Sequence, residues 1–269
     1  MTLAQRARLL RRLVAINMAV TVAYPFDFFC YMLGAVLSPL IAALVWRAAV
    51  ASGAELPVDT SYLMTYFVLL AVVSMLTSSW LSGFLANSIR NGKLSVWLAR
   101  PGSLLYEMAA NNVAEKAFKT VVLFPMVALF AWFFREDFAV TARAWQWGII
   151  VLAILMGAVI AVSLDVAEGS LAFWLDDVSG LIKARALAAA VLAGQVVPLA
   201  LMPEWAQGFL RAQPFRYILS FPLELMVGDL SRNEIVYGVV VQVMYTVLFV
   251  VAARWLWSTG KRSYAAVGA

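Results

Sequence analysis

Hydrophobic residues run along this chain in long, nearly unbroken stretches, without the one-sided periodicity of a soluble helix. Six stretches approach the length of about 20 mostly apolar residues that a helix needs to cross a bilayer. They are Phe28–Val50, Tyr62–Ala86, Phe118–Phe134, Trp147–Trp174, Leu181–Met202 and Ile235–Trp257. The pattern predicts an all-α polytopic membrane protein with six transmembrane helices, organised as a single transmembrane domain over residues 1–269.

The N-terminal residues 1–26 follow a different pattern. Apolar residues recur every three or four positions behind a cluster of arginines: Leu9, Leu13, Ile16, Val20 and Tyr24 behind Arg6, Arg8, Arg11 and Arg12. This is typical of an amphipathic helix lying at the membrane interface. The alternative is a signal peptide. No small-residue cleavage pattern follows the apolar run, and another span begins at once, which favours the interfacial helix.

Composition supports the membrane class and narrows the chemistry. Hydrophobic residues make up 64% of the chain and charged residues 13%, against about 45–50% and about 25% in soluble domains. There is no His, a single Cys (Cys30), and no GxxxxGK[ST] or GxGxxG motif. We therefore assign no catalytic residue and no metal ligand, and any nucleotide energy must come from another chain. The basic residues form no aromatic-interleaved patch, so nucleic acid is not an expected partner.

Basic residues in the loops predict the orientation. With the N-terminus inside, fourteen of the 20 Lys and Arg residues fall on the inner side, as the positive-inside rule requires. Both termini are then cytoplasmic. The longest outer segment, residues 203–234, contains Pro203, Pro214, Pro222 and Gly228 between short apolar pieces. These pieces are too short to span, and we expect broken helices that dip into the outer leaflet.

Residues 87–117 form the expected cytoplasmic connection between the second and third spans. Gly92 can end one helix, and Pro101–Gly102 can stop the next. Between them, Leu94, Trp97 and Leu98 lie at helical spacing beside Arg90, Lys93 and Arg100. A short amphipathic helix fits this pattern. It either rests on the lipid headgroups or docks a cytoplasmic partner.

The same segment carries a family resemblance. The pattern Gly92-Lys93-Leu94-Ser95-x-x-Leu98-x-Arg100-Pro101 resembles the coupling region of type-2 ABC exporter permeases, most closely the small six-span family of uncharacterised ABC transporter permease subunits. The Ala172-Phe173-Trp174 stretch and the basic-Tyr tail at residues 261–268 are similar to that family's corresponding segments. The resemblance covers essentially the whole chain.

The resemblance implies a plasma-membrane permease that pairs with a second permease subunit, as a homodimer or heterodimer, and with a dimer of ABC ATPase subunits. ATP and Mg²⁺ would bind to the ATPase, and no cofactor to this chain. Export of an amphipathic substrate by alternating access is favoured, because no Glu-Ala-Ala…Gly importer loop surrounds Glu115. The implied ATPase-coupling residues are Arg90, Gly92, Lys93, Leu94, Ser95, Trp97, Leu98, Arg100 and Pro101.

Two acidic residues interrupt the fourth apolar stretch. Asp165 and Glu168 lie three residues apart, on one helical face. If the span continues to Trp174, both are intramembrane and need partners, and Lys183 and Arg185 are the nearest cations in the sequence. If the span ends near Leu164, both are solvated. Their presence leaves a proton-coupled secondary transporter as the alternative function, although no internal repeat supports it.

Overall fold

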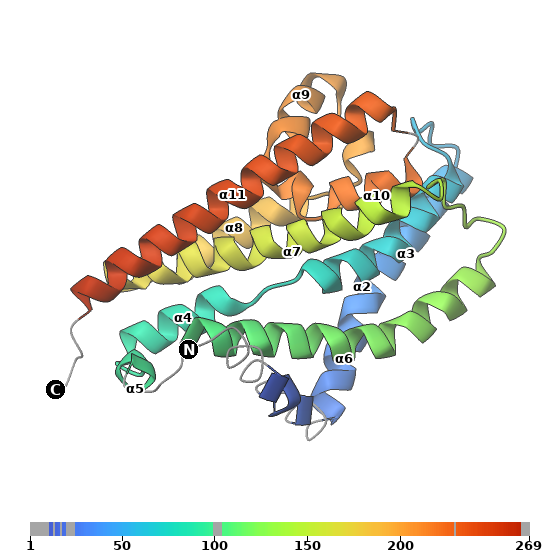
Figure 1. Cartoon of the computed structure of the whole chain (residues 1–269). Coiled ribbons are helices and arrows are strands. Elements are labelled where there is room, and N and C mark those ends of the chain that lie inside the picture. The colour runs from blue at the N-terminus through green and yellow to red at the C-terminus, as the bar shows by residue number, and fades with distance from the viewer. Residues whose placement is uncertain are drawn as a thin grey trace.

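The computed structural model is a bundle of helices (Figure 1), with no strand among the residues that it describes. These are residues 11–12, 14–16, 18–19, 25–98, 104–228 and 230–264. The expected interfacial helix over residues 1–26 lies largely outside them, although residues 11–12, 14–16 and 18–19 are helical. Arg100 and Pro101 of the expected coupling segment also lie outside the described residues.

Among the described residues, five helical stretches are long and apolar enough to cross a membrane, which confirms an all-α polytopic membrane protein. They are α2 (Pro25–Ala51), α3 with α4 (Thr60–Thr77 and Leu81–Arg90), α6 (Leu104–Phe133), α7 (Gln146–Ser170) and α11 (Arg232–Ser263). Figure 1 shows α4, α5 (Leu94–Leu98) and the end of α11 at one end of the bundle, called here the α5 end. The α10 helix and the start of α11 lie toward the other end.

The second and third spans differ from expectation. The second is interrupted after Thr77: Ser78 has an extended conformation, with φ −57° and ψ 145°, and α4 begins only at Leu81. The third is longer than expected, because residues 104–117 belong to α6 and not to the connecting segment. Charged residues within that part of α6 break the apolar pattern, which is why the sequence indicated a short span.

The fifth expected span, Leu181–Met202, is not one continuous helix. Its helix α8 (Ser179–Leu192) has 14 residues, so it is about 21 Å long, less than the ~30 Å hydrocarbon core. The helix stops before Gly194, whose φ of 76° suits a helix C-terminus. Pro198 follows and cannot continue a helix.

Short helices complete this crossing. They are η2 (Leu199–Leu201), α9 (Glu204–Ala212), η3 (Pro214–Tyr217) and α10 (Ser220–Val227). Since α7 and α11 both run toward the α5 end in Figure 1, the chain must return between them, and α8 with these pieces makes that return. This fifth crossing, between α7 and α11, is therefore a broken one.

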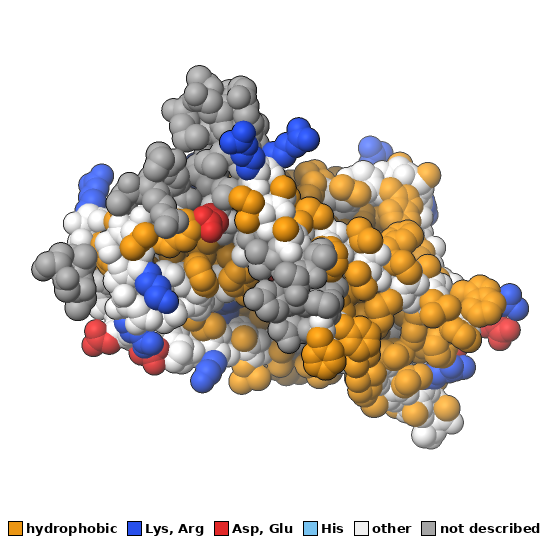
Figure 2. Space-filling view, turned by 90° about the horizontal axis from the view of Figure 1, so that it is seen from below, with side chains coloured by type: hydrophobic (Ala, Val, Ile, Leu, Met, Phe, Trp, Pro, Cys, Tyr) orange, Lys and Arg blue, Asp and Glu red, His pale blue; other side chains and the backbone are white. Residues whose placement is uncertain are grey.

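The outer surface of the bundle is strongly apolar. Large hydrophobic side chains on α2, α6 and α11 are exposed, including Phe29, Ile41, Val121, Phe124 and Met244. Figure 2 shows hydrophobic side chains over much of one face, with charged side chains gathered mostly toward its ends. This distribution is the reverse of a soluble surface and suits contact with lipid. The buried core lies between α3, α7 and the short helices η3 and α10.

Candidate coupling segment and buried charge cluster

The expected coupling segment forms a helix–turn–helix at the α5 end. Helix α4 ends at Arg90, and the chain reverses through Asn91–Gly92–Lys93 into α5. Gly92 adopts φ 71°, a conformation that residues with a Cβ rarely take. The backbone N–H of Gly92 bonds the carbonyl of Ile89, and the Ser95 hydroxyl donates to the Gly92 carbonyl. Gly92 therefore sets the angle at which α5 leaves α4.

The three apolar residues of this segment do not share one surface. Leu94 is fully buried in a cluster with Leu104 and Met108, which fastens α5 to the start of α6. Leu98 is 51% exposed and Trp97 is half-buried. Leu94 is thus an anchor, whereas Leu98 is open to a partner or to lipid.

The charged residues around α5 face outward. Arg90 and Lys93 are both exposed. Arg90 lines a cavity of about 120 Å³ between α4 and α8, together with Asp176 and Asp177 from the turn before α8. The backbone N–H and the hydroxyl of Ser179 both donate to Asp177, and these bonds lower the pKa of its carboxyl. The α5 end therefore presents charges of both signs to its surroundings.

The structure brings Asp165 and Glu168 together with Arg185. The Arg185 Nη2 lies 2.6 Å from Asp165 Oδ1, and its Nε lies 2.8 Å from Glu168 Oε2. Asp165 and Glu168 are buried, with 1% and 6% exposure. The alternative in which the helix ends near Leu164 and both carboxylates are solvated is wrong, because α7 continues to Ser170. Lys183, the other cation proposed from the sequence, is exposed, and the ion pairs to these two carboxylates come from Arg185.

The second oxygen of Asp165 contacts the break in the second span. The Ser79 hydroxyl and the Leu81 backbone N–H both donate to Asp165 Oδ2, each at 2.7 Å. The first N–H groups of a helix have no partner within the helix, and this carboxylate supplies one for α4. Asp165 is thus a helix cap contributed by a different helix.

Helix α6 holds the same break from the other side. The Asn112 side chain donates to the Ser78 carbonyl at 3.4 Å, and the Trp80 indole N–H donates to Glu115 Oε2. Glu115 also pairs with Lys119, which is 2% exposed. These contacts were not predicted from the sequence, because Glu115 was expected in the connection between two spans. The tandem serines Ser78–Ser79 were the available signal, since serine favours helix termini over helix interiors.

Polar groups also satisfy the C-terminal end of α8. The Gln213 side chain donates to the Leu192 carbonyl at 2.7 Å, and the Ser220 hydroxyl donates to the Ala193 carbonyl at 2.7 Å. The Tyr66 hydroxyl of α3 donates to the Gly194 carbonyl at 2.9 Å. A helix end inside a membrane protein requires such partners, because an unpaired carbonyl in hydrocarbon costs several kcal/mol. This explains how the fifth span can break.

A polar cavity lies between the break and α8. It has a volume of about 360 Å³, and its lining combines polar residues, including Ser74, Ser78, Ser79 and Arg185, with apolar ones such as Phe215 of η3. Ala186 and Ala189 of α8 and Ala193, just after it, also line the cavity. The buried charge cluster therefore borders a space that α8 helps to enclose.

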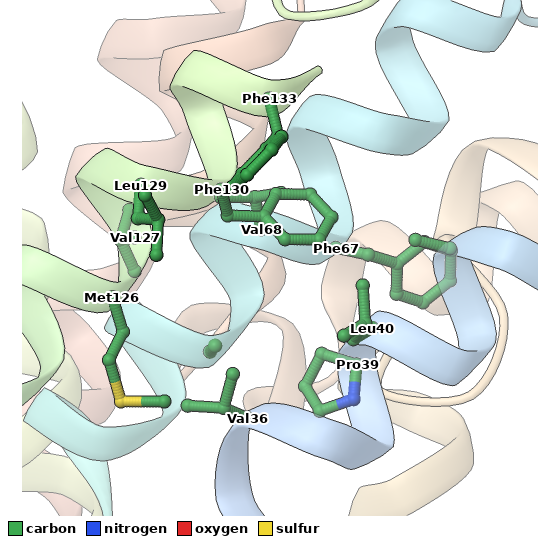
Figure 3. Close-up of a pocket in the computed structure, with 12 residues that line it drawn as sticks. Val36, Pro39, Leu40, Phe67, Val68, Met126, Val127, Leu129, Phe130 and Phe133 are labelled. Atoms are coloured by element: carbon green, nitrogen blue, oxygen red, sulfur yellow. The ribbon is translucent and has the colours of Figure 1, made fainter.

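A second, wholly apolar groove lies among α2, α3 and α6 (Figure 3). It has a volume of about 220 Å³. In Figure 3, Pro39 and Leu40 of α2 lie across from Phe130 and Phe133 of α6, with Phe67 and Val68 of α3 between the two helices. The groove is suited to hydrocarbon, not to a polar solute.

No three His, Cys, Asp or Glu side chains in the described part of the chain gather closely enough to hold a metal ion.

These features define a class: an integral membrane protein of helical spans, two of them interrupted, with a short helix presented beyond the bundle. A sequence model of the ABC-2 family transporter proteins matches residues 58–268, and the chain belongs to that family. It is therefore a membrane permease component of an ABC transporter, which works with an ABC ATPase and is not itself the catalytic subunit. A comparison with curated proteins finds no match.

Proposed function

We propose that this chain is the permease subunit of an ATP-driven exporter that moves an amphipathic substrate outward by alternating access. A dimer of ABC ATPase subunits binds ATP and Mg²⁺, and a second permease subunit completes the pathway. Both termini of this chain lie in the cytoplasm, at the plasma membrane. ATP drives the cycle because it binds one conformational state of the complex more tightly than the other.

The coupling segment is the observation that carries this proposal. It lies within the matched residues 58–268 and combines a fixed turn at Gly92, a buried anchor at Leu94 and an exposed apolar residue at Leu98. An anchored helix with an outward apolar side chain suits docking to a cytoplasmic subunit, since force applied to α5 passes through Leu94 into α6 and through the turn into α4. A helix that only rested on headgroups would not need this rigid anchor.

The direction of transport is supported by the surroundings of Glu115. In this structure Glu115 lies within α6, bonded to Trp80 and Lys119, and not in an exposed loop that could serve an importer ATPase.

The substrate class is supported by the two cavities. One is apolar and borders the lipid-facing helices α2 and α6, and the other is polar and borders Arg185. A molecule with a hydrocarbon part and a polar part matches both.

The alternative, a proton-coupled secondary transporter, finds less support. Its candidate carriers Asp165 and Glu168 are both ion-paired to Arg185, and Asp165 accepts two further hydrogen bonds. Arg185, Ser79 and the Leu81 N–H occupy both oxygens of Asp165, so this carboxylate serves as an ion-pair partner and a helix cap. A group that must take up and release protons in each cycle needs a more labile environment.

Replacing Leu98 with aspartate tests the docking role. We expect Leu98→Asp to weaken binding of the ATPase about tenfold or more, because an unpaired carboxylate in an apolar contact costs several kcal/mol. The measurement is the amount of ATPase that co-purifies with the permease in mild detergent, with binding titrated by added ATPase. Leu94 is unsuitable for this test, since its burial means that a charge there would disrupt the fold.

A matched control is Ser258→Asp, which adds the same charge at an exposed position of α11 near the α5 end. We expect this variant to retain the ATPase. Equal retention of the ATPase by Leu98→Asp and by the parent chain would show that α5 is not the docking helix.

A further inference from the structure

Two buried carboxylates link α4 with α8: Glu168 contacts Ser82 and Arg185, and Asp165 makes the larger number of contacts. The Oδ2 atom of Asp165 accepts from Ser79 and Leu81 at the start of α4, and its Oδ1 atom accepts from Arg185 on α8. The residue itself belongs to a third helix, α7, which packs closely on both α4 and α11. One side chain thus connects the helix that carries the coupling turn with the helix that lines the polar cavity.

Helix α4 is not continuous with α3. The two are separated by Ser78–Trp80, where the regular helical hydrogen bonds stop, so the break can act as a pivot. Beyond the pivot, α4 has ten residues and leads directly into the Gly92 turn and α5. Any displacement of α5 by a docked subunit therefore rotates α4 about the break. Such a rotation changes the hydrogen bonds that three side chains make to the break at Ser78–Trp80 and the start of α4: those of Asp165, Asn112 and Glu115.

Helix α8 is held more by polar contacts than by apolar packing. None of its 14 residues is fully buried. Its attachments are the Arg185 ion pairs on one side and the bonds that Gln213, Ser220 and Tyr66 make to its C-terminal end. Because its alanines line the polar cavity, a shift of α8 changes the shape of that cavity.

We propose that Asp165 is a positioning residue for transport: it transmits movement of α4 to α8, and so links the docked ATPase to the cavity wall. This inference rests on the proposed function, because it requires a partner that moves α5. In the conformation seen here the carboxylate holds α4 and Arg185 at once. When α4 rotates, Ser79 and Leu81 move away from Asp165 Oδ2, and the carboxylate turns. Arg185 then either moves with the carboxylate or shifts its bond from Oδ1 to Oδ2. Because Arg185 belongs to α8, either change moves α8.

The test measures two movements separately in the assembled permease–ATPase complex. In a Cys30→Ser background, one pair of spin labels at Asn87 and Thr259 reports the distance between α4 and α11. A second pair at Lys183 and Thr259 reports the distance between α8 and α11. All three positions are exposed, and mixing labelled with unlabelled permease isolates distances within one subunit. Each distance is recorded without nucleotide and with ATP, Mg²⁺ and vanadate.

We expect nucleotide to change both distances in the parent complex. In Asp165→Asn the α4 shift should persist, whereas most of the α8 shift should be lost. Ser79→Ala, which removes one contact to Oδ2 and keeps the Arg185 ion pair, should reduce the α8 shift and serves if Asp165→Asn yields too little protein. Glu224→Gln is the matched control, because it breaks the comparably buried Arg216–Glu224 pair in the short helices after α8. It should leave both shifts unchanged.

The outcomes separate the two proposals. An α8 shift of parental size in both Asp165→Asn and Ser79→Ala would overturn the role of Asp165 and leave the proposed function intact. A parent complex in which nucleotide moves neither α4 nor α8 would overturn the proposed function, and this inference with it. Equal loss of the α8 shift in Glu224→Gln would show that any broken ion pair has this effect, and would also overturn the role of Asp165.

Discussion

Replacing Arg185 with methionine is expected to destabilise the permease by about 3–5 kcal/mol, among the largest effects available from one substitution. The change leaves Asp165 and Glu168 buried without a cation, at 1% and 6% exposure. Removing one partner of a buried pair costs far more than the pair contributes, because the remaining charge has lost both water and its counterion. The measurement is the denaturation midpoint of the purified chain in detergent, compared with the parent.

Two further variants sharpen this prediction. Arg211→Met breaks the exposed Arg211–Glu234 pair, whose atoms are 3.6 Å apart, and should cost less than about 1 kcal/mol. The triple variant Arg185→Met, Asp165→Asn, Glu168→Gln removes every charge of the cluster and should recover much of the lost stability. A denaturation midpoint of Arg185→Met within error of that of Arg211→Met would contradict the buried ion pair.

Alanine at Gly238 is expected to destabilise the chain by about 1–3 kcal/mol through overpacking. Gly238 lies in α11, and a Cβ there would lie 2.1 Å from Cε2 of Phe221. The Phe221 ring is fully buried between α3, α7 and η3, so it has no space into which to move. The substitution must therefore push α11 away from the core. The readout is again the denaturation midpoint.

Gly208 provides the matched glycine. It lies within α9, and a Cβ there would meet no atom within 4 Å. Since alanine is about 1 kcal/mol better than glycine inside a helix, Gly208→Ala should be neutral or stabilising. Opposite signs for the two substitutions are the expected result. A loss at Gly208 as large as that at Gly238 would mean that helix packing in this region differs from the one described.

The membrane class could be predicted from the sequence because it depends on composition and run length alone. Long apolar runs such as Trp147–Trp174 have few other uses in a protein. The break at Ser78–Trp80 could not be predicted in the same way, since the polar run Thr77–Ser79 fits a helix end but also fits the small polar residues common in membrane helices. What holds the break open is Asp165, 84 residues from Leu81 along the chain, and no local pattern reveals such a partner.

The polar residues of α6 led to a different error. Glu107, Glu115 and Lys116 lowered the local hydropathy, so residues 104–117 were assigned to the connection between the second and third spans. In the folded chain Lys119 is buried beside Glu115, and Glu115 binds the Trp80 indole N–H. Paired charges reduce the cost of burial, which hydropathy averages cannot represent. The i, i+4 spacing of Glu115 and Lys119 was the local signal for a helix.

The buried charge cluster was partly accessible from sequence. The spacing of Asp165 and Glu168 placed both carboxylates on one helical face, and the need for a cation pointed to the start of the next helix. The choice between Lys183 and Arg185 required the structure, because it depends on which face of α8 turns toward α7. The guanidinium of Arg185 reaches both carboxylates with two different nitrogens, a geometry that a lysine ammonium does not provide.

The most direct test of the central claim is ATP-driven flux through the reconstituted complex. The permease is purified from its native cells together with its associated subunits. The complex is then reconstituted into proteoliposomes in the presence of an extract of the same cells' lipids and small molecules. ATP and Mg²⁺ added outside act only on complexes whose ATPase faces outward. An exporter then loads the vesicle lumen, and mass spectrometry of washed vesicles should show an amphipathic compound that accumulates only with ATP. Accumulation that follows a pH gradient without ATP, or ATP-driven loss from the lumen, would contradict the account.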